Sequence, residues 1–253
     1  MTKSALITGA GSGIGRGLTL TLARRGYQLY LLGKDEYKLR AVAGEIASFC
    51  RPSLYRVDLS DRDERAHFVD NLLSESAPPG LVIHNAALMP AGNFLQLPTR
   101  ELEATLAVNL LAPAELTRRL CAASPAPEGV IFILSTAARF PQPFNSMYSA
   151  SKAGLRFLAE SLQVELAGKT RVCLAYPPLT ETPMTTSFKA PVRKADPLPV
   201  AEKIINAYER RHDEVTWLDL EIFPVMFYRL FPRLFRQLLK SRRQSLAKLF
   251  YFE

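Results

Sequence analysis

Short apolar runs alternate with longer amphipathic segments along most of the chain. Six runs rich in aliphatic and aromatic residues predict buried strands. They lie at residues 5–8, 28–32, 53–57, 81–84, 130–134 and 171–176. The amphipathic segments are long enough for helices and lie at residues 14–25, 35–49, 61–74, 99–122, 148–167 and 200–211. Apolar strands separated by helices predict a doubly wound parallel sheet with helices on both faces, that is, an α/β fold.

The composition is that of one globular domain with a sizeable core. The chain has 253 residues, of which 48% are hydrophobic and 22% charged. It shows neither a signal-peptide pattern nor a run of about 18 apolar residues, so we expect no secretion and no membrane-spanning helix. Three well-separated cysteines without a CxxC pair favour a reducing, cytoplasmic compartment. The three histidines lack ligand spacing, so no metal site is predicted.

Five glycines lie where the first strand passes into the first helix, in TGAGSGIGRG at Thr8–Gly17. Glycines allow a tight turn and let the backbone approach a pyrophosphate, whose charge is met by amides at the helix N-terminus. Because this turn follows a strand and opens a helix, it indicates dinucleotide binding.

The end of the second strand indicates which dinucleotide binds. An acid there would accept hydrogen bonds from a ribose 2′-hydroxyl, whereas a cation would meet a 2′-phosphate. Gly33 stands where the acid would lie, Lys34 follows it, and Arg16 can add a second positive charge. Asp35 fits better as the N-cap of the next helix. The sequence therefore favours NADP(H) over NAD(H), the alternative being that Lys34 is only a solvated loop lysine.

Tyr148 and Lys152 lie one turn apart on the same face of a predicted helix. A fixed ammonium would lower the pKa of the phenol from its usual value of about 10, so that it exchanges a proton with a substrate oxygen. Ser135, at the end of a predicted strand, can donate to the same oxygen. These three residues predict acid–base chemistry at a carbonyl or an alcohol.

At this point the sequence resembles the short-chain dehydrogenase/reductase family over residues 4–184. The matching segments, in chain order, are TGAGSGIG (Thr8–Gly15), Asp58 in RVDLS, HNAA (His84–Ala87), Asn109 in AVNLL, Ser135, Tyr148 with Lys152, and PPLTET (Pro177–Thr182). Three residues depart from the family, since Ala87, Ala138 and Pro178 stand where glycine is usual.

The resemblance implies hydride transfer between a nicotinamide and a carbonyl carbon. It makes Tyr148 the general acid/base and places Ser135 at the reacting oxygen. Lys152 would contact the nicotinamide ribose, and Asn109 would help to position a water in the proton relay. The cofactor contacts that it implies are Thr8, Gly9, Ser12, Gly13, Ile14, Gly15, Lys34, Asp58, Leu59, Asn85, Ala86, Tyr148, Lys152, Pro177, Thr180 and Thr182.

Two further segments follow the last predicted strand. Residues 177–199 are rich in Pro, Thr and Ser and predict a substrate lid. Residues 223–253 hold seven basic residues and one acid, which is most of the net charge of +8. Because the rest of the chain is nearly neutral, this charge does not indicate nucleic-acid binding.

The C-terminal segment predicts amphipathic helices, with Pro232 as a kink or as the start of a second helix. Its basic face holds Arg229, Arg233, Arg236, Lys240 and Arg243, and its apolar side holds Leu230, Phe231, Leu234, Phe235, Leu238 and Leu239. One interpretation packs these helices on their own domain or on another subunit of a homo-oligomer. The other places them on an anionic membrane surface, near a hydrophobic substrate.

We therefore expect a Rossmann-like three-layer catalytic domain over residues 1–222 and an amphipathic helical extension over residues 223–253. The expected protein is a cytoplasmic oxidoreductase that prefers NADP(H) and acts on a ketone or secondary alcohol of an apolar substrate. Two other classes stay open, a catalytically silent dinucleotide sensor or scaffold and a membrane-peripheral interaction protein. The presence of Ser135, Tyr148 and Lys152 argues against the first of these.

Overall fold

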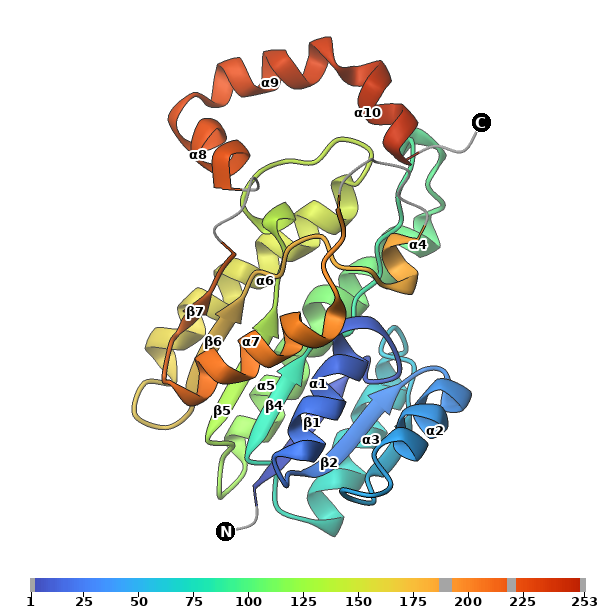
Figure 1. Ribbon diagram of the computed structural model, residues 1–253, viewed down its shortest axis with the longest axis vertical. Coiled ribbons are helices and arrows are strands. Elements are labelled where there is room, and N and C mark those ends of the chain that lie inside the picture. Colours follow the sequence, from blue (N-terminus) through green and yellow to red (C-terminus); the bar gives the residue numbers. More distant parts are fainter. Residues whose placement is uncertain (1–2, 187–192, 218–221, 251–253) are drawn as a thin grey trace.

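The computed structural model describes residues 3–186, 193–217 and 222–250. Within these residues, seven parallel strands form one sheet in the order β3-β2-β1-β4-β5-β6-β7 (Figure 1). They are β1 (Ser4–Thr8), β2 (Gln28–Gly33), β3 (Ser53–Arg56), β4 (Leu81–His84), β5 (Gly129–Ile133), β6 (Arg171–Ala175) and β7 (Glu214–Val215). The predicted fold class is confirmed, as are the six predicted strands.

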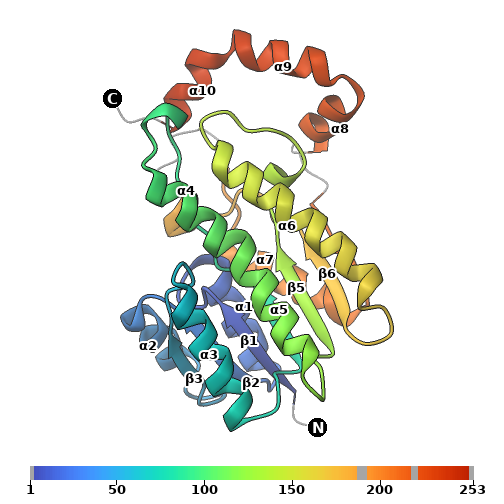
Figure 2. The same ribbon diagram turned by 180° about the vertical axis from the view of Figure 1, so that it is seen from behind.

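Helices cover both faces of the sheet, and each face has its own hydrophobic core. Helices α1, α2 and α7 pack on one face (Figure 1), and α3, α5 and α6 pack on the other (Figure 2). The helices of this domain are α1 (Gly13–Arg24), α2 (Glu36–Glu45), α3 (Arg62–Glu75), α4 (Thr99–Leu106), α5 (Ala112–Ala122), α6 (Ser146–Glu165) and α7 (Pro197–Glu209). Short helical turns are η1 (Phe94–Gln96), η3 (Thr136–Ala138) and η4 (Pro183–Thr185). The predicted N-cap is confirmed, since the Asp35 side chain accepts the Lys38 N–H at 3.1 Å.

The predicted helix at 99–122 is not continuous. A π-helical turn, η2 (Ala107–Leu111), separates α4 from α5. Pro113 supplies a physical reason, because it has no N–H to offer the Asn109 carbonyl in an α-helical bond. The amphipathic pattern alone did not reveal this change of helical period.

β7 is the one strand that the apolar pattern missed. It is only two residues long, and just one of them, Val215, is buried. The strand forms because β6 offers its free edge, where Ala175 is aligned with Val215. Such a short strand depends on tertiary pairing and carries no period of its own.

Among the described residues after β7, three helices form an arch over the carboxyl ends of the strands (Figure 1). They are α8 (Ile222–Leu230), α9 (Pro232–Ser241) and α10 (Arg243–Phe250). Pro232 begins a second helix, as one of the two alternatives predicted. No helix of the described residues is long and apolar enough to cross a membrane. Residues 187–192 of the predicted lid lie outside the described residues.

Candidate active site

The turn between β1 and α1 is fixed by close backbone contacts. Gly9 has a φ of +65°, and a Cβ on Gly15 would lie 2.0 Å from the Gly9 carbonyl oxygen, so only glycine fits at either position. The Asn85 side chain donates to the carbonyls of Thr8 at 3.0 Å and Gly9 at 3.2 Å. The Thr8 hydroxyl accepts the N–H groups of Asn85 and Ala86 at 3.0 and 3.1 Å. These bonds lock the carboxyl ends of β1 and β4 together.

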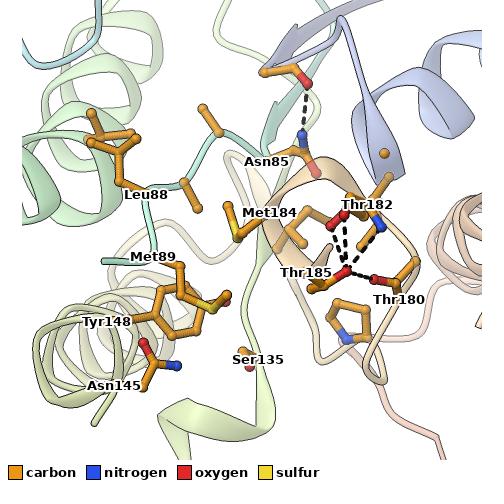
Figure 3. Close-up of a pocket in the computed structure, with 18 of the residues that line it drawn as sticks. Asn85, Leu88, Met89, Ser135, Asn145, Tyr148, Thr180, Thr182, Met184 and Thr185 are labelled. Carbon is orange, nitrogen blue, oxygen red and sulfur yellow. Dashed lines mark hydrogen bonds between the residues drawn. The ribbon is translucent and has the colours of Figure 1, made fainter. Parts of the chain in front are cut away.

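A cavity of about 720 Å³ lies beside this turn, at the carboxyl ends of the strands. Its volume is in the range of small-molecule and cofactor sites. In Figure 3, the labelled side chains of Asn85, Ser135 and Tyr148 line this cavity. The predicted site residues in its wall are Gly9, Ser12, Gly13, Ile14, Lys34, Asp58, Leu59, Asn85, Ala86, Ser135, Tyr148, Pro177, Thr180 and Thr182. Four others lie outside the wall, namely Thr8, Gly15, Asn109 and Lys152.

Ser135, Tyr148 and Lys152 come together where β5 meets α6. Ser135 follows β5, and its hydroxyl oxygen accepts the Ala137 N–H at 3.2 Å. Tyr148 lies in the first turn of α6, with 8% of its surface exposed. The Lys152 Nζ donates to the Ile133 carbonyl at 2.8 Å and lies 5.9 Å from the centroid of the Tyr148 ring. The three side chains predicted for acid–base chemistry thus lie in one small region of the structure.

Burial controls the protonation of this group. It raises the pKa of the Tyr148 phenol, and a hydrogen bond with Ser135 offsets part of that rise. It also lowers the pKa of Lys152 to about 8. The expectation that Lys152 lowers the pKa of Tyr148 is therefore wrong for the protein as described, because desolvation dominates. At neutral pH the phenol holds its proton.

The Asn109 side chain has a structural role that the sequence did not predict. Its Oδ1 accepts the Leu88 N–H at 2.7 Å, while its Nδ2 donates to the Leu88 carbonyl at 2.8 Å and to the Ser151 Oγ at 2.9 Å. Because these bonds use both ends of the amide, the side chain anchors the loop after β4 to α6. A relay water would therefore need a different group of Asn109.

Lys34 and Arg16, the two cations predicted for a 2′-phosphate, are placed differently. Lys34 lies in the cavity wall, and its Nζ is 2.5 Å from the Asp58 carboxylate. Burial tends to raise the pKa of Asp58, but hydrogen bonds from Lys34 and Ser60 outweigh it and lower that pKa. Arg16 instead pairs with Glu45 of α2 and is not in the wall. Lys34 is thus the one of these two cations that faces the cavity.

The loop after β6 carries the threonines predicted at the cofactor. The Thr185 hydroxyl donates to the Thr180 carbonyl at 2.7 Å and accepts the Thr182 N–H at 3.1 Å (Figure 3). A Cβ on Gly13 would lie 2.7 Å from the Thr182 Cγ2. The loop therefore lies directly against the glycine turn, as expected for residues that share a ligand.

The arch supplies cavity residues that the sequence did not identify. Pro224 of α8, Leu239 of α9 and Leu246 of α10 line the same cavity as Tyr148. Phe235 of α9 is 5% exposed and packs edge-on against Phe140, with ring centroids 5.6 Å apart. One face of the arch thus packs on its own domain. The apolar spacing of these residues indicated a buried face, but not what covers it.

Comparison with known proteins shows which family the chain belongs to. The family described as short chain dehydrogenase matches residues 3–192. Probable oxidoreductase EphD from Mycobacterium tuberculosis is 33% identical over 198 residues, which cover 73% of this chain and 32% of that protein. The chain thus spans about a third of the length of this relative. Human 17-beta-hydroxysteroid dehydrogenase type 3 is 29% identical over 195 residues, covering 74% of this chain and 62% of the human protein.

Solved structures agree with this assignment. A short-chain dehydrogenase from Sphingobium yanoikuyae in complex with NADPH superposes with a TM-score of 0.75 at 25% identity, covering 97% of this chain and 95% of that one. Other solved structures similar to the chain hold NADP or NADH. The chain therefore belongs to the short-chain dehydrogenase/reductase family of NAD(P)-dependent oxidoreductases.

Proposed function

We propose that the protein transfers a hydride between NADP(H) and a ketone or secondary alcohol of an apolar substrate. The observation that carries this proposal is the shared cavity, whose wall holds the glycine turn together with Ser135 and Tyr148. We assign residues 1–222 to the catalytic domain and residues 223–253 to a segment that closes the substrate end. The three free cysteines of the protein, Cys50, Cys121 and Cys173, support a cytoplasmic location.

The residues of the cavity fit a nicotinamide dinucleotide. Helix α1 begins at Gly13 in the cavity wall, so the amides of its first turn can meet a pyrophosphate. Asp58 and Lys34 suit the adenosine end, and Ser135 and Tyr148 suit the nicotinamide end. When bound, the cofactor supplies or accepts the hydride.

Tyr148 would then move the proton. Because burial keeps its phenol protonated at neutral pH, Tyr148 is suited to donate a proton to the oxygen of a carbonyl under reduction. The Ser135 hydroxyl would hold that oxygen. We assign contact with the nicotinamide ribose to Lys152. For Asn109, we assign the relay water to its backbone carbonyl, since Pro113 cannot donate to that carbonyl.

The cofactor preference rests on Lys34. Gly33, at the end of β2, offers no carboxylate to a 2′-hydroxyl, while the neighbouring Lys34 is largely exposed in the cavity wall. Its partner Asp58 holds the Lys34 ammonium at the adenosine end. There a 2′-phosphate can replace the carboxylate as the partner of this ammonium, or share the ammonium with it. Relatives solved with NADP support this assignment, although another was solved with NADH.

An apolar substrate is supported by the rest of the wall. The residues around the acid–base group are mostly apolar, and they include Leu88, Met89, Phe140, Leu179, Met184 and Leu239. The human relative is named as a dehydrogenase of a hydroxysteroid, which is a bulky apolar alcohol. A wall of this kind disfavours sugars and other strongly polar carbonyls.

Two measurements test the proposal. NADPH oxidation with a panel of steroid, retinoid, acyl and sugar carbonyls should be fastest with apolar ketones, and no reduction of any ketone would favour the silent sensor. Dissociation constants for NADPH and NADH should differ at least about tenfold in the wild type, because a charge-assisted phosphate contact is lost with NADH. Lys34→Ala should remove most of that difference by weakening NADPH alone. Equal affinities in the wild type would contradict the preference for NADP(H).

A further inference from the structure

The arch has an outer side that the catalytic site does not use. On its inner side, the Phe227 and Phe235 rings pack with centroids 5.9 Å apart, and Phe235 is buried against the domain. Those contacts account for one face of α8 and one face of α9. Other large apolar side chains on the two helices remain exposed, and we call them the outer stripes, although the rings of Phe223 and Phe231 also touch Phe227.

The outer stripes consist of large apolar side chains at helical spacing. On α8, Phe223, Met226 and Leu230 are 73%, 55% and 65% exposed. At the N-cap of α9 and along the helix, Phe231, Leu234 and Leu238 are 55%, 52% and 42% exposed. Both sets follow the spacing i, i+3, i+7, so each forms a continuous line along its helix. Since such contiguous apolar surface is rare on a free protein, it marks an interaction site.

A basic stripe runs along the other side of α9. Arg233, Arg236 and Lys240 follow a spacing of three and four residues, Arg243 lies three residues further on at the start of α10, and all four are exposed. Residues 222–250 contain seven basic residues and no acid. The ion pairs formed among the described residues involve none of these seven. Elsewhere in the domain, arginines such as Arg16 and Arg65 are paired with carboxylates.

Charge and shape together favour one occupant. A second copy of the chain would cover the apolar stripes but leave the basic stripe, on the other side of α9, without a partner. A nucleic acid would meet the cations but leave the apolar stripes in water. An anionic bilayer satisfies both, because an amphipathic helix lies in the interface with its apolar side in the acyl boundary and its cations among the phosphates.

We propose that the outer face of α8 and α9 docks on the surface of an anionic lipid bilayer. The outer stripes enter the boundary between headgroups and acyl chains, and the basic stripe contacts lipid phosphates. The arch also lines the cavity through Pro224 and Leu239, so docking places the substrate end of the cavity at the lipid surface. The proposal concerns localisation and does not depend on turnover.

Vesicle co-sedimentation of the full chain tests this docking. The protein should sediment with vesicles of phosphatidylcholine mixed with phosphatidylglycerol, and much less with pure phosphatidylcholine. High salt should weaken the binding, because it screens the lipid phosphates. Equal sedimentation with both kinds of vesicle, or with neither, would overturn the proposal.

Two sets of variants locate the contact. Arg233→Gln with Arg236→Gln and Lys240→Gln should weaken binding on the order of a hundredfold, from three lost cation–lipid contacts. A matched control carries the same charge change at the opposite end of the molecule, in Arg24→Gln, Arg51→Gln and Lys169→Gln. This control should bind like the wild type, and a comparable loss there would show an effect of net charge only and overturn the proposal.

The apolar stripes need their own variant. Phe223→Ser with Leu230→Ser and Leu234→Ser should also weaken vesicle binding on the order of a hundredfold, while NADPH affinity and the melting temperature stay unchanged because these side chains are exposed. Sedimentation velocity should show the same mass for wild type and variant. A dimer that this variant abolishes, without vesicle binding by the wild type, would assign the stripes to a second copy and overturn the proposal.

Discussion

The glycine turn and the C-terminal arch border the same cavity, but different forces hold them. The turn is fixed by backbone hydrogen bonds and by contacts so close that Gly15 has no room for a Cβ. The arch is held by aromatic packing such as that of Phe235 on Phe140, and many of its side chains are exposed. The turn therefore tolerates almost no change, whereas the arch can vary in sequence and adapt to a substrate. Changes in the turn should affect the cofactor, and changes in the arch should affect the substrate.

The largest effect is expected from Gly15→Ala. The new Cβ would lie 2.0 Å from the Gly9 carbonyl oxygen and 2.7 Å from the Asn85 amide nitrogen, so the turn must move. We expect NADPH affinity to fall by at least about a hundredfold, since the helix amides no longer face the cofactor. Fluorescence titration with NADPH measures this loss.

Gly44→Ala is the matched control for that change. A Cβ at Gly44, on the exposed side of α2, meets no atom within 4 Å. We expect unchanged NADPH affinity and a gain of about 0.5–1 kcal/mol in the free energy of unfolding, because alanine is the better helix former. Equal loss of NADPH affinity in both variants would mean that the close contact is not the cause.

A smaller effect, confined to the substrate, is expected from Phe235→Ala. The substitution removes the ring that joins α9 to Phe140 and to Phe227. The KM for an apolar ketone should rise about tenfold while the dissociation constant of NADPH changes less than about twofold. The neighbouring Leu234→Ala, which is half exposed, should leave both constants unchanged. A parallel loss of NADPH affinity in Phe235→Ala would contradict the assignment of the turn to cofactor binding and of the arch to substrate binding.

The smallest effect is expected from Leu239→Ala. This change enlarges the cavity but keeps the contact between Phe235 and Phe140 that holds the arch on the domain. Loss of a partly buried leucine should change the KM of different apolar ketones by about three- to tenfold, and bulkier ketones should gain relative to smaller ones. Steady-state kinetics with a homologous series of ketones reads this out. An identical shift for every ketone would show that Leu239 does not contact the substrate.

The sequence predicted the part of the molecule that local patterns specify. Six strands, the glycine turn and the meeting of Ser135 with Tyr148 follow from apolar periodicity and from motifs that lie at strand ends. Neither β7 nor the contact of Phe235 with Phe140 has such a local signal, because each depends on a partner far away in the chain.

The sequence was also a poor guide to the electrostatics of the site, for a related reason. The spacing of Tyr148 and Lys152 suggested a lowered phenol pKa, but the spacing says nothing about desolvation, which is the larger effect. The sequence also offered Arg16 as a second positive charge for a phosphate but did not reveal its ion pair with Glu45 of α2. Side-chain partners from other elements decide such questions, and they become visible only in the folded chain.

Tyr148→Phe provides the most direct test of the central claim, that the phenol is the general acid/base of a hydride-transferring enzyme. The change removes one oxygen and keeps the ring, so the fold and the NADPH dissociation constant should stay as in the wild type. With the ketone that the wild type reduces fastest, kcat should fall by about a hundredfold to ten-thousandfold, the usual contribution of a positioned acid. Retention of wild-type kcat with normal NADPH binding would contradict the account.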